Sequence, residues 1–99
     1  MSPRLKKPRY YNCPYRGDSE RLYKPAGIPL REMEHITIGR DEMEAMFLCD
    51  AENMSQEAAG EMMGVSRGTV QRLLTKGRKK TIEALVLGKA LAIEGISQT

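Results

Sequence analysis

Residues 60 to 74 read "GEMMGVSRGTVQRLL", and this short stretch decides the predicted fold. Gly64 is expected to stop one helix, because glycine adopts a positive φ without steric cost. Ser66 follows two residues later and is a good N-cap for the next helix. Two helices joined by so short a turn, with glycine at its first position, are typical of a helix-turn-helix.

The apolar residues of this stretch are spaced to pack in the corner between the two helices. Gly60 lies four residues before Gly64, where the helices approach most closely and only a small residue fits. Val65, Val70 and Leu73 would fill the corner. The opposite side of the second helix is then forced outward.

The outward side carries side chains that suit duplex DNA. Arginine forks onto guanine O6 and N7, and glutamine onto adenine N6 and N7. The predicted base contacts are therefore Arg67, Gln71 and Arg72. Hydroxyls, helix N-termini and point charges suit phosphates, and a small residue allows close approach. The predicted backbone contacts are Ser66, Gly68, Thr69, Thr75, Lys76, Lys79 and Lys80. A generic helical hairpin with a solvated basic face is the alternative interpretation.

Charged residues are sorted along the chain, so the net charge of +3 understates the local fields. Residues 1 to 31 hold eight Lys or Arg against two acids, and residues 32 to 61 hold nine acids against Arg40 alone. Residues 62 to 82 hold six bases and no acid. This sorting predicts a folded domain with faces of opposite sign.

Helical patterns continue on both sides of the central stretch. Asp41 is a plausible N-cap for a first helix that ends near Asp50, and Ser55 begins the second helix. The third helix would run from Arg67 well past Lys80, although Gly77 costs about 1 kcal/mol relative to alanine and allows a bend. The tail "ALVLGKALAIEG" is expected to stay helical until Gly95. The segment "HITIG" is expected to be a short strand or an extended lead-in.

Length and composition favour one small helical domain. Ninety-nine residues suffice for a single core, and only 5% of them are aromatic, so Met, Leu, Ile, Val and Ala must build that core. Prolines rule out long helices at the start of the chain. We therefore predict an all-α three-helix domain over residues 37–99, preceded by a basic, proline-rich arm and loop over residues 1–36.

The sequence offers little support for other functions. Cys13 and Cys49 have no second thiol or histidine at ligand spacing, His35 is the only histidine, and no glycine-rich phosphate loop is present. We expect no metal, no cofactor and no enzymatic activity. The most apolar stretch is about half the length of a membrane span, and no secretory signal is visible, so we expect a cytoplasmic protein without membrane contact.

Three features of the N-terminal region leave alternatives open. The segment "PRLKKPRYY" either reaches the minor groove or backbone of DNA as a flexible arm, or only adds to the positive field. Its tyrosines, and Tyr15 and Tyr23 beyond it, are expected to pack a loop onto the helical core rather than to stack on bases. Basic neighbours would lower the pKa of Cys13 and allow redox sensing.

Four segments together resemble a known family: "PAGIPL", "DEMEAMFLCD", "SQEAAGEMMGVSRGTVQRLL" and "ALVLGKALAIEG". They look like a group of small prokaryotic proteins catalogued as domain of unknown function 134, or uncharacterised protein family 0251. The resemblance covers about residues 3 to 96. It implies DNA binding through a trihelical core similar to region 4 of sigma factors, with the recognition helix at Ser66 to Thr75. Gly60 and Gly77 depart from the alanine usual in that family.

The function expected from these observations is sequence-specific binding of double-stranded DNA in transcriptional regulation. One helix-turn-helix covers only a few base pairs, so a homodimer or a protein partner is expected. The tail from Leu85 to Ile96 would form that interface or complete the core. The rival hypothesis is an interaction module that docks on the transcription machinery through the acidic face around the first two helices. Structured RNA is a third possible ligand.

Overall fold

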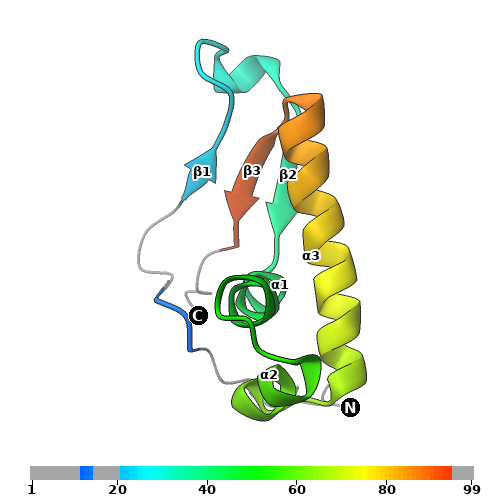
Figure 1. Ribbon diagram of the computed structural model, residues 1–99. Helices are drawn as coiled ribbons and strands as arrows, with labels where there is room; N and C mark the ends of the chain where they lie inside the picture. The colour runs from blue at the N-terminus through cyan, green and yellow to red at the C-terminus, as the bar shows by residue number, and fades with distance from the viewer. Residues whose placement is uncertain (1–11, 15–20, 95–99) are drawn as a thin grey trace, which may run out of the picture.

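The computed structural model describes residues 12–14 and 21–94, and Figure 1 shows their arrangement. The helices are α1 (Arg40–Met46), α2 (Gln56–Met63) and α3 (Arg67–Leu87), and a π-helical turn η2 (Phe47–Ala51) extends α1. The strands are β1 (Leu22–Tyr23), β2 (His35–Ile38) and β3 (Ala90–Ile93), and a 3-10 turn η1 (Leu30–Glu32) precedes β2. Helix α3 runs along the molecule from α2 at one end to the sheet at the other.

The three strands form a mixed sheet in the order β1-β3-β2. β2 and β3 are parallel, with His35 opposite Ala90 and Ile38 opposite Ile93. β1 is antiparallel to β3, with Leu22 opposite Ala92. Two segments that are more than fifty residues apart in the sequence are thus joined by backbone hydrogen bonds, and all three helices lie on the connection between β2 and β3.

The predicted all-α class is wrong, because the protein combines its helices with this sheet. The error lies in the tail expected to remain helical until Gly95. Gly88 adopts φ 69°, ψ 35° and ends α3, and the next residues turn back as β3. A four-residue apolar run fits a buried strand as well as a helix, so periodicity alone did not separate the two. The alternative of a short strand at "HITIG" is confirmed.

The helix starts agree with the sequence at α2 and differ at α1. Ser55 caps α2 as predicted, and its Oγ accepts a hydrogen bond from the backbone N–H of Ala58 at 3.0 Å. The N-cap of α1 is Gly39 rather than Asp41. Glu42, three residues into the helix, accepts the backbone N–H of Gly39 on its Oε1 at 2.9 Å, so this carboxylate satisfies the exposed start of the helix.

The main core lies where α1, η2, α2 and α3 meet. Its buried side chains are Ala45, Leu48, Ala59, Met63, Val70, Leu73 and Leu74. Gly77 belongs to the same packing, because a Cβ on this residue would lie 2.6 Å from Sδ of Met46 on α1. The glycine therefore allows α1 to cross close to α3, and α3 continues through it as one helix.

A buried carboxylate ties residues 12 and 13 to the helical core. Glu44 on α1 is 0% exposed, and its two oxygens accept the backbone N–H groups of Asn12 and Cys13 at 2.5 and 3.1 Å. The side-chain amide of Asn12 also donates to the carbonyl of Met62 at 3.1 Å. Burying a charge requires such hydrogen bonds, so Glu44 fixes this segment beside α1 and the end of α2.

Candidate nucleic-acid interface

The corner between α2 and α3 is built by the residues that the sequence singled out. Gly64 is left-handed at φ 74°, ψ 32°, and its N–H caps the end of α2 by donating to the carbonyls of Glu61 and Gly60. Ser66 caps α3, with its Oγ accepting the N–H of Thr69 at 3.1 Å. A Cβ on Gly60 would lie 2.8 Å from the carbonyl oxygen of Val65, which confirms the close approach expected there.

Packing in this corner fixes which side of α3 faces outward. Val70 and Leu74 are essentially fully buried, Leu73 is nearly so, and Val65 is half-buried against them. The sides of α3 away from these residues are exposed. Arg67, Gln71 and Arg72, the predicted base contacts, are all exposed there, together with Gly68. The structure therefore brings these side chains to one end of one helix, at the corner with α2.

Three side chains form a hydrogen-bonded row along the first two turns of α3. Oγ of Ser66 and Oγ1 of Thr69 share a hydrogen bond at 3.0 Å. Nη2 of Arg72 donates to the same Oγ1 of Thr69 at 3.2 Å. The row draws the Arg72 guanidinium toward the start of α3 and limits its rotamers, so less side-chain entropy is lost when it binds a ligand.

The other predicted backbone contacts differ in how they are placed. Lys76 and Thr75 are exposed, and the Thr75 hydroxyl donates to the carbonyl of Gln71 at 3.0 Å. Nζ of Lys79 pairs with Glu83 at 2.7 Å. Nζ of Lys80 is drawn inward to the buried carboxylate of Glu42 at 2.8 Å. Lys79 and Lys80 would have to leave these partners, or share them, before they could bind phosphate.

An ion pair that the sequence did not reveal holds the middle of α3 against η2. Nε and Nη2 of Arg78 donate to the two carboxylate oxygens of Asp50 at 3.1 and 2.6 Å. The hydrogen bonds from Arg78 lower the pKa of Asp50, and those same bonds raise the pKa of Arg78. Twenty-eight residues separate the partners, so no local pattern could have predicted that Arg78 holds α3 against η2.

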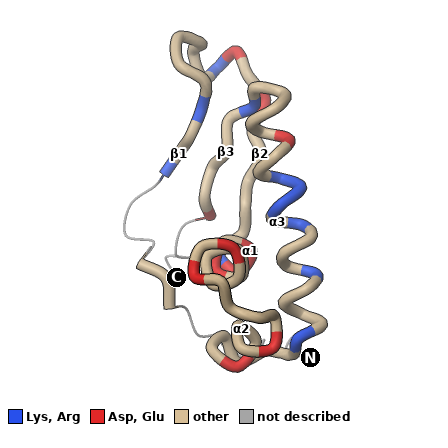
Figure 2. The backbone as a smooth tube through the Cα atoms, in the orientation of Figure 1, with Lys and Arg blue, Asp and Glu red and all other residues tan. Residues whose placement is uncertain are grey.

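Charge in the folded protein is separated between elements. Figure 2 shows Lys and Arg along α3, with Asp and Glu gathered on α1 and α2. On α2, Glu57 and Glu61 are both exposed. This carries a cost for DNA binding, because acidic groups beside the α2–α3 corner would repel a phosphate backbone that came too close to them. Among the residues that the structure describes around this corner, the exposed basic side chains lie on α3.

The cysteines, the histidine and the tyrosines that the sequence raised as candidates do not lie on α3. Cys13 is buried at 3% exposure, which removes it from solvent oxidants, and Cys49 is half-buried against the core. Burial raises the pKa of the Cys49 thiol, and the adjacent Asp50 raises it further. His35 is exposed on β2. Tyr23 lies in β1, whereas the segment "PRLKKPRYY" and Tyr15 lie outside the described residues.

Two other kinds of feature are missing from the part of the chain that the structure describes. Within residues 12–14 and 21–94, no three His, Cys, Asp or Glu side chains gather closely enough to hold a metal ion. In the same ranges, no helix is both long and apolar enough to cross a membrane.

Comparison with protein families matches residues 1–98 to the model described as protein of unknown function DUF134. The chain belongs to the DUF134 family. A UPF0251 protein of Desulforudis audaxviator is 48% identical over 73 residues, which are 74% of this chain and 48% of that protein. A UPF0251 protein of Halothermothrix orenii is 47% identical over 75 residues, covering 76% and 56% of the two chains.

Other relatives match over different lengths. The UPF0251 protein DET0218 of Dehalococcoides mccartyi is 42% identical over 90 residues, which are 89% of this chain and 77% of that protein. The chain spans about half the length of the first of these curated DUF134 relatives. No solved structure matches the chain.

Proposed function

We propose that this DUF134 protein binds double-stranded DNA in a sequence-specific manner and regulates transcription. The observation that carries the proposal is the exposure of Arg67, Gln71 and Arg72 on the first turns of a helix whose other side is locked in the α2–α3 corner. In this proposal α2 and α3 act as a helix-turn-helix, and α3 enters the major groove with its N-terminal half.

In this proposal one set of side chains discriminates between base sequences, and another supplies affinity for the phosphate backbone. Arg67, Gln71 and Arg72 offer the forked donors and the amide that base edges recognise. Lys76, the start of α3 and the nearby hydroxyls would contact phosphates and set the position of the helix on the duplex. One such helix covers only a few base pairs, so genomic specificity requires a second copy of the chain or a protein partner.

A salt titration on random-sequence duplex DNA tests this proposal. Binding measured by fluorescence anisotropy should weaken as salt rises, because each neutralised phosphate releases counterions. Lys76→Ala should make the slope of log K against log salt less steep by about 0.9. The matched control is Lys24→Ala, since Lys24 is exposed on the loop after β1 and donates to the carbonyls of Pro25 and Ile28. Affinity that does not change with salt would count against the proposal.

The exposed acids favour one second candidate function. Glu57 and Glu61 lie one turn apart on α2 and are open to solvent. A basic surface of the transcription machinery would find a complementary face there. Docking of that kind would also depend on salt, so the two functions are separated by substitution: Lys76→Ala weakens only DNA binding, whereas Glu57→Gln with Glu61→Gln weakens only protein docking.

A further inference from the structure

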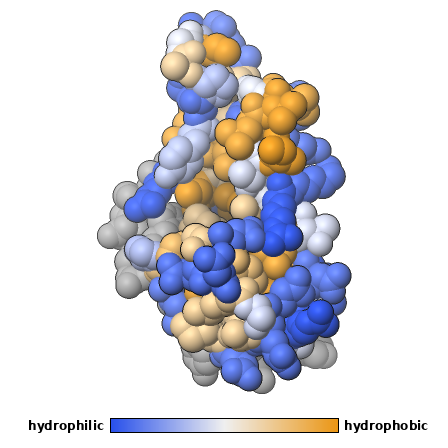
Figure 3. Space-filling view, viewed as in Figure 1, coloured by the Kyte–Doolittle hydropathy of each residue, from blue (hydrophilic) through white to orange (hydrophobic). Residues whose placement is uncertain are grey.

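The outward side of α3 changes its chemistry between its two halves. Leu85 follows Arg67 by about five helical turns and Ile82 follows Gln71 by about three, so the pairs lie on the same side of the helix. The first half of that side is polar and basic. In the second half Ile82, Leu85 and Val86 are 54%, 73% and 71% exposed. Figure 3 shows the apolar patch as an orange area on the C-terminal end of α3.

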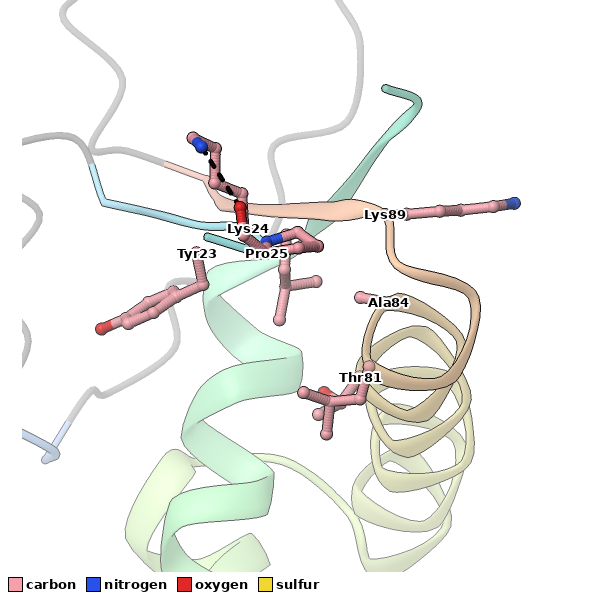
Figure 4. A pocket seen from close by; sticks show the side chains of 8 residues that line it. Tyr23, Lys24, Pro25, Thr81, Ala84 and Lys89 are labelled. Carbon is pink, nitrogen blue, oxygen red and sulfur yellow. Dashed lines mark hydrogen bonds between the residues drawn. The ribbon is translucent and has the colours of Figure 1, made fainter. Parts of the chain in front are cut away.

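An apolar cavity of about 450 Å³ adjoins this patch between α3 and the β1–β3 edge. Its lining includes Tyr23, Pro25, Thr81, Ala84, Leu85 and Leu91. Leu85 is common to the cavity and the patch, so the two form one continuous apolar surface. Figure 4 shows Tyr23, Pro25, Ala84 and Thr81 around the space, with the sheet on one side and α3 on the other.

The charged groups beside the cavity already have partners. Nζ of Lys24 donates to the carbonyls of Ile28 and Pro25 at 2.7 and 3.2 Å. Nζ of Lys89 pairs with Glu34 at 3.0 Å. An anionic small molecule would have to displace these contacts, whereas an apolar side chain would not. The surface therefore suits an apolar protein occupant better than an acidic ligand.

We propose that this surface is the interface of a parallel homodimer, in which the C-terminal halves of two α3 helices pack together. Ile82, Leu85 and Val86, taken with Tyr23 across the cavity, expose about 500 Å² by their relative exposures, against roughly 800 Å² per partner in a standard interface. Leu87 is also exposed, but it lies about 150° around the helix from this patch and is not counted in it. A patch on a two-fold axis contacts its own copy, so an apolar patch is complementary to itself. The area predicts a reversible dimer.

Charge favours the parallel orientation. Arg78 and Glu83 lie on opposite sides of the line through Ile82 and Val86 and are five residues apart. Glu83 already pairs with Lys79 of its own helix at 2.7 Å, so it would accept from both cations. In parallel helices this spacing places Arg78 of one copy across the interface from Glu83 of the other, as g and e positions meet in coiled coils. A guanidinium has five N–H donors, and the bonds to Asp50 come from Nε and Nη2, so Arg78 can serve both carboxylates. An antiparallel arrangement would place the two basic halves at opposite ends of the dimer, where they could not bind the same duplex together.

The parallel dimer gives the basic halves of α3 a specific geometry. Gln71 lies about 22 Å along the helix from Val86, so two basic halves would diverge from the apolar contact and bind on either side of a duplex. Basic-region zipper proteins use the same polarity, with basic N-terminal halves forking from an apolar C-terminal contact. The binding of the two diverging basic halves to one duplex rests on the proposed DNA binding, whereas the dimer requires only the apolar surface.

Sedimentation equilibrium of the full chain from micromolar to millimolar concentration tests the dimer. The wild-type chain should show a concentration-dependent dimer, and a double variant with Leu85→Asp and Val86→Asp should remain a monomer with unchanged circular dichroism. Met62→Asp is the matched control, because Met62 is an exposed apolar residue on α2, 39% exposed, and should leave the dimer intact. A wild-type chain that is monomeric throughout the range would overturn the proposal.

Cysteine cross-linking tests the orientation. In a parallel pair, chains carrying Ile82→Cys or Val86→Cys should each form a disulfide with their own copy under mild oxidation, because both levels lie near the two-fold axis. The wild-type chain, with Cys13 and Cys49 only, is the background control. Cross-links that form only between an Ile82→Cys chain and a Val86→Cys chain would show antiparallel packing and contradict the parallel arrangement of the two α3 helices.

The same variants separate this proposal from the proposed function. If both are correct, the double variant with Leu85→Asp and Val86→Asp keeps its salt-dependent binding to random duplex but binds long selected sites with about 10-fold or greater loss. If the wild-type chain dimerises without binding duplex DNA at any salt concentration, the DNA-binding proposal fails while the dimer stands. If the wild-type chain stays strictly monomeric but binds random duplex in a salt-dependent manner, the dimer proposal fails while the DNA-binding proposal stands.

Discussion

Arg72 is the residue at which local structure and proposed recognition meet most closely. Its guanidinium donates a hydrogen bond to Thr69, and Thr69 shares a hydrogen bond with Ser66, the N-cap of α3. Hydrogen bonds therefore connect the start of the helix to this candidate base contact. Arg67 and Gln71 lie on neighbouring turns without such a support among the described contacts. We therefore expect Arg72 to be the best ordered of the three before DNA is bound.

Replacing Arg72 with alanine should separate base reading from phosphate binding. Loss of a forked contact to guanine costs about 1–3 kcal/mol, so affinity for selected sites should fall by roughly 5- to 150-fold. Random duplex should lose much less, because only one charge is removed. Fluorescence anisotropy on both DNAs measures the difference, with Arg31→Ala on η1 as a control. Equal losses on both DNAs would make Arg72 a phosphate contact.

At the scale of elements, the ends of helices account for both the success and the failure of sequence prediction. Ser55, Gly64 and Ser66 mark the ends of α2 and the start of α3 because caps act over three or four residues. The pairing of β2 with β3 has no local signal, since "HITI" and "ALAI" are short apolar runs joined across the whole helical segment. The sheet was therefore missed.

Gly88 is the position at which helix becomes sheet. Its φ of 69° is unfavourable for residues with a Cβ, so Gly88→Ala should lower the free energy of unfolding by about 1 kcal/mol. The same substitution at Gly68 should raise stability by up to about 1 kcal/mol, because a Cβ there meets nothing closer than 3.7 Å and alanine favours helix. Urea unfolding compares the two variants. Equal effects would mean that the turn at Gly88 does not constrain the fold.

The ion pair between η2 and α3 should make stability depend on acid pH. Arg78 lowers the folded-state pKa of Asp50, so the pair stabilises the fold above the unfolded-state pKa, and this contribution disappears as pH falls through the folded-state pKa. Asp50→Asn should lower the free energy of unfolding at neutral pH by no more than about 1 kcal/mol, because the side chains of Arg78 and Asp50 are 52% and 43% exposed.

Unfolding curves measured from neutral to strongly acidic pH check this expectation. The wild-type and Asp50→Asn chains should converge once the pH falls below the lowered folded-state pKa of Asp50, where the aspartate is protonated in both the folded and unfolded states. Asp50→Asn introduced into an Arg78→Gln chain should cause little further loss, which tests that the two residues act as a pair. A constant difference at every pH would show that the effect of Asp50 is not electrostatic.

At the scale of the whole molecule, the helical part could be predicted from sequence and the sheet could not. The orientation of α3 followed from apolar spacing at Val70 and Leu73, and the exposure of the predicted base contacts followed from that orientation. The partners of Lys80 and Arg78 could not be foreseen, because the carboxylates reach them only through the crossing of α1 and η2 with α3. The partners of these charged side chains are determined by contacts between segments that are distant in the sequence.

The whole molecule then places its charges and its apolar surface at different points of one helix. The basic half of α3 lies at the corner with α2, and the apolar half lies at the sheet. The exposed acids of α2, Glu57 and Glu61, lie beside the first region, whereas Glu42 of α1 reaches Lys80 between the two regions. A partner that binds the corner and a partner that binds the apolar end can therefore be present together, as a duplex and a second copy of the chain would be.

Amide chemical shifts recorded as duplex DNA is added to the labelled chain test the central claim most directly. We expect the largest changes on the N-terminal half of α3, from Ser66 to Thr75, with smaller changes at Lys76 and little change at His35 on β2. Changes confined to Glu57, Glu61 and their neighbours on α2, with α3 unaffected, would contradict DNA recognition by this helix.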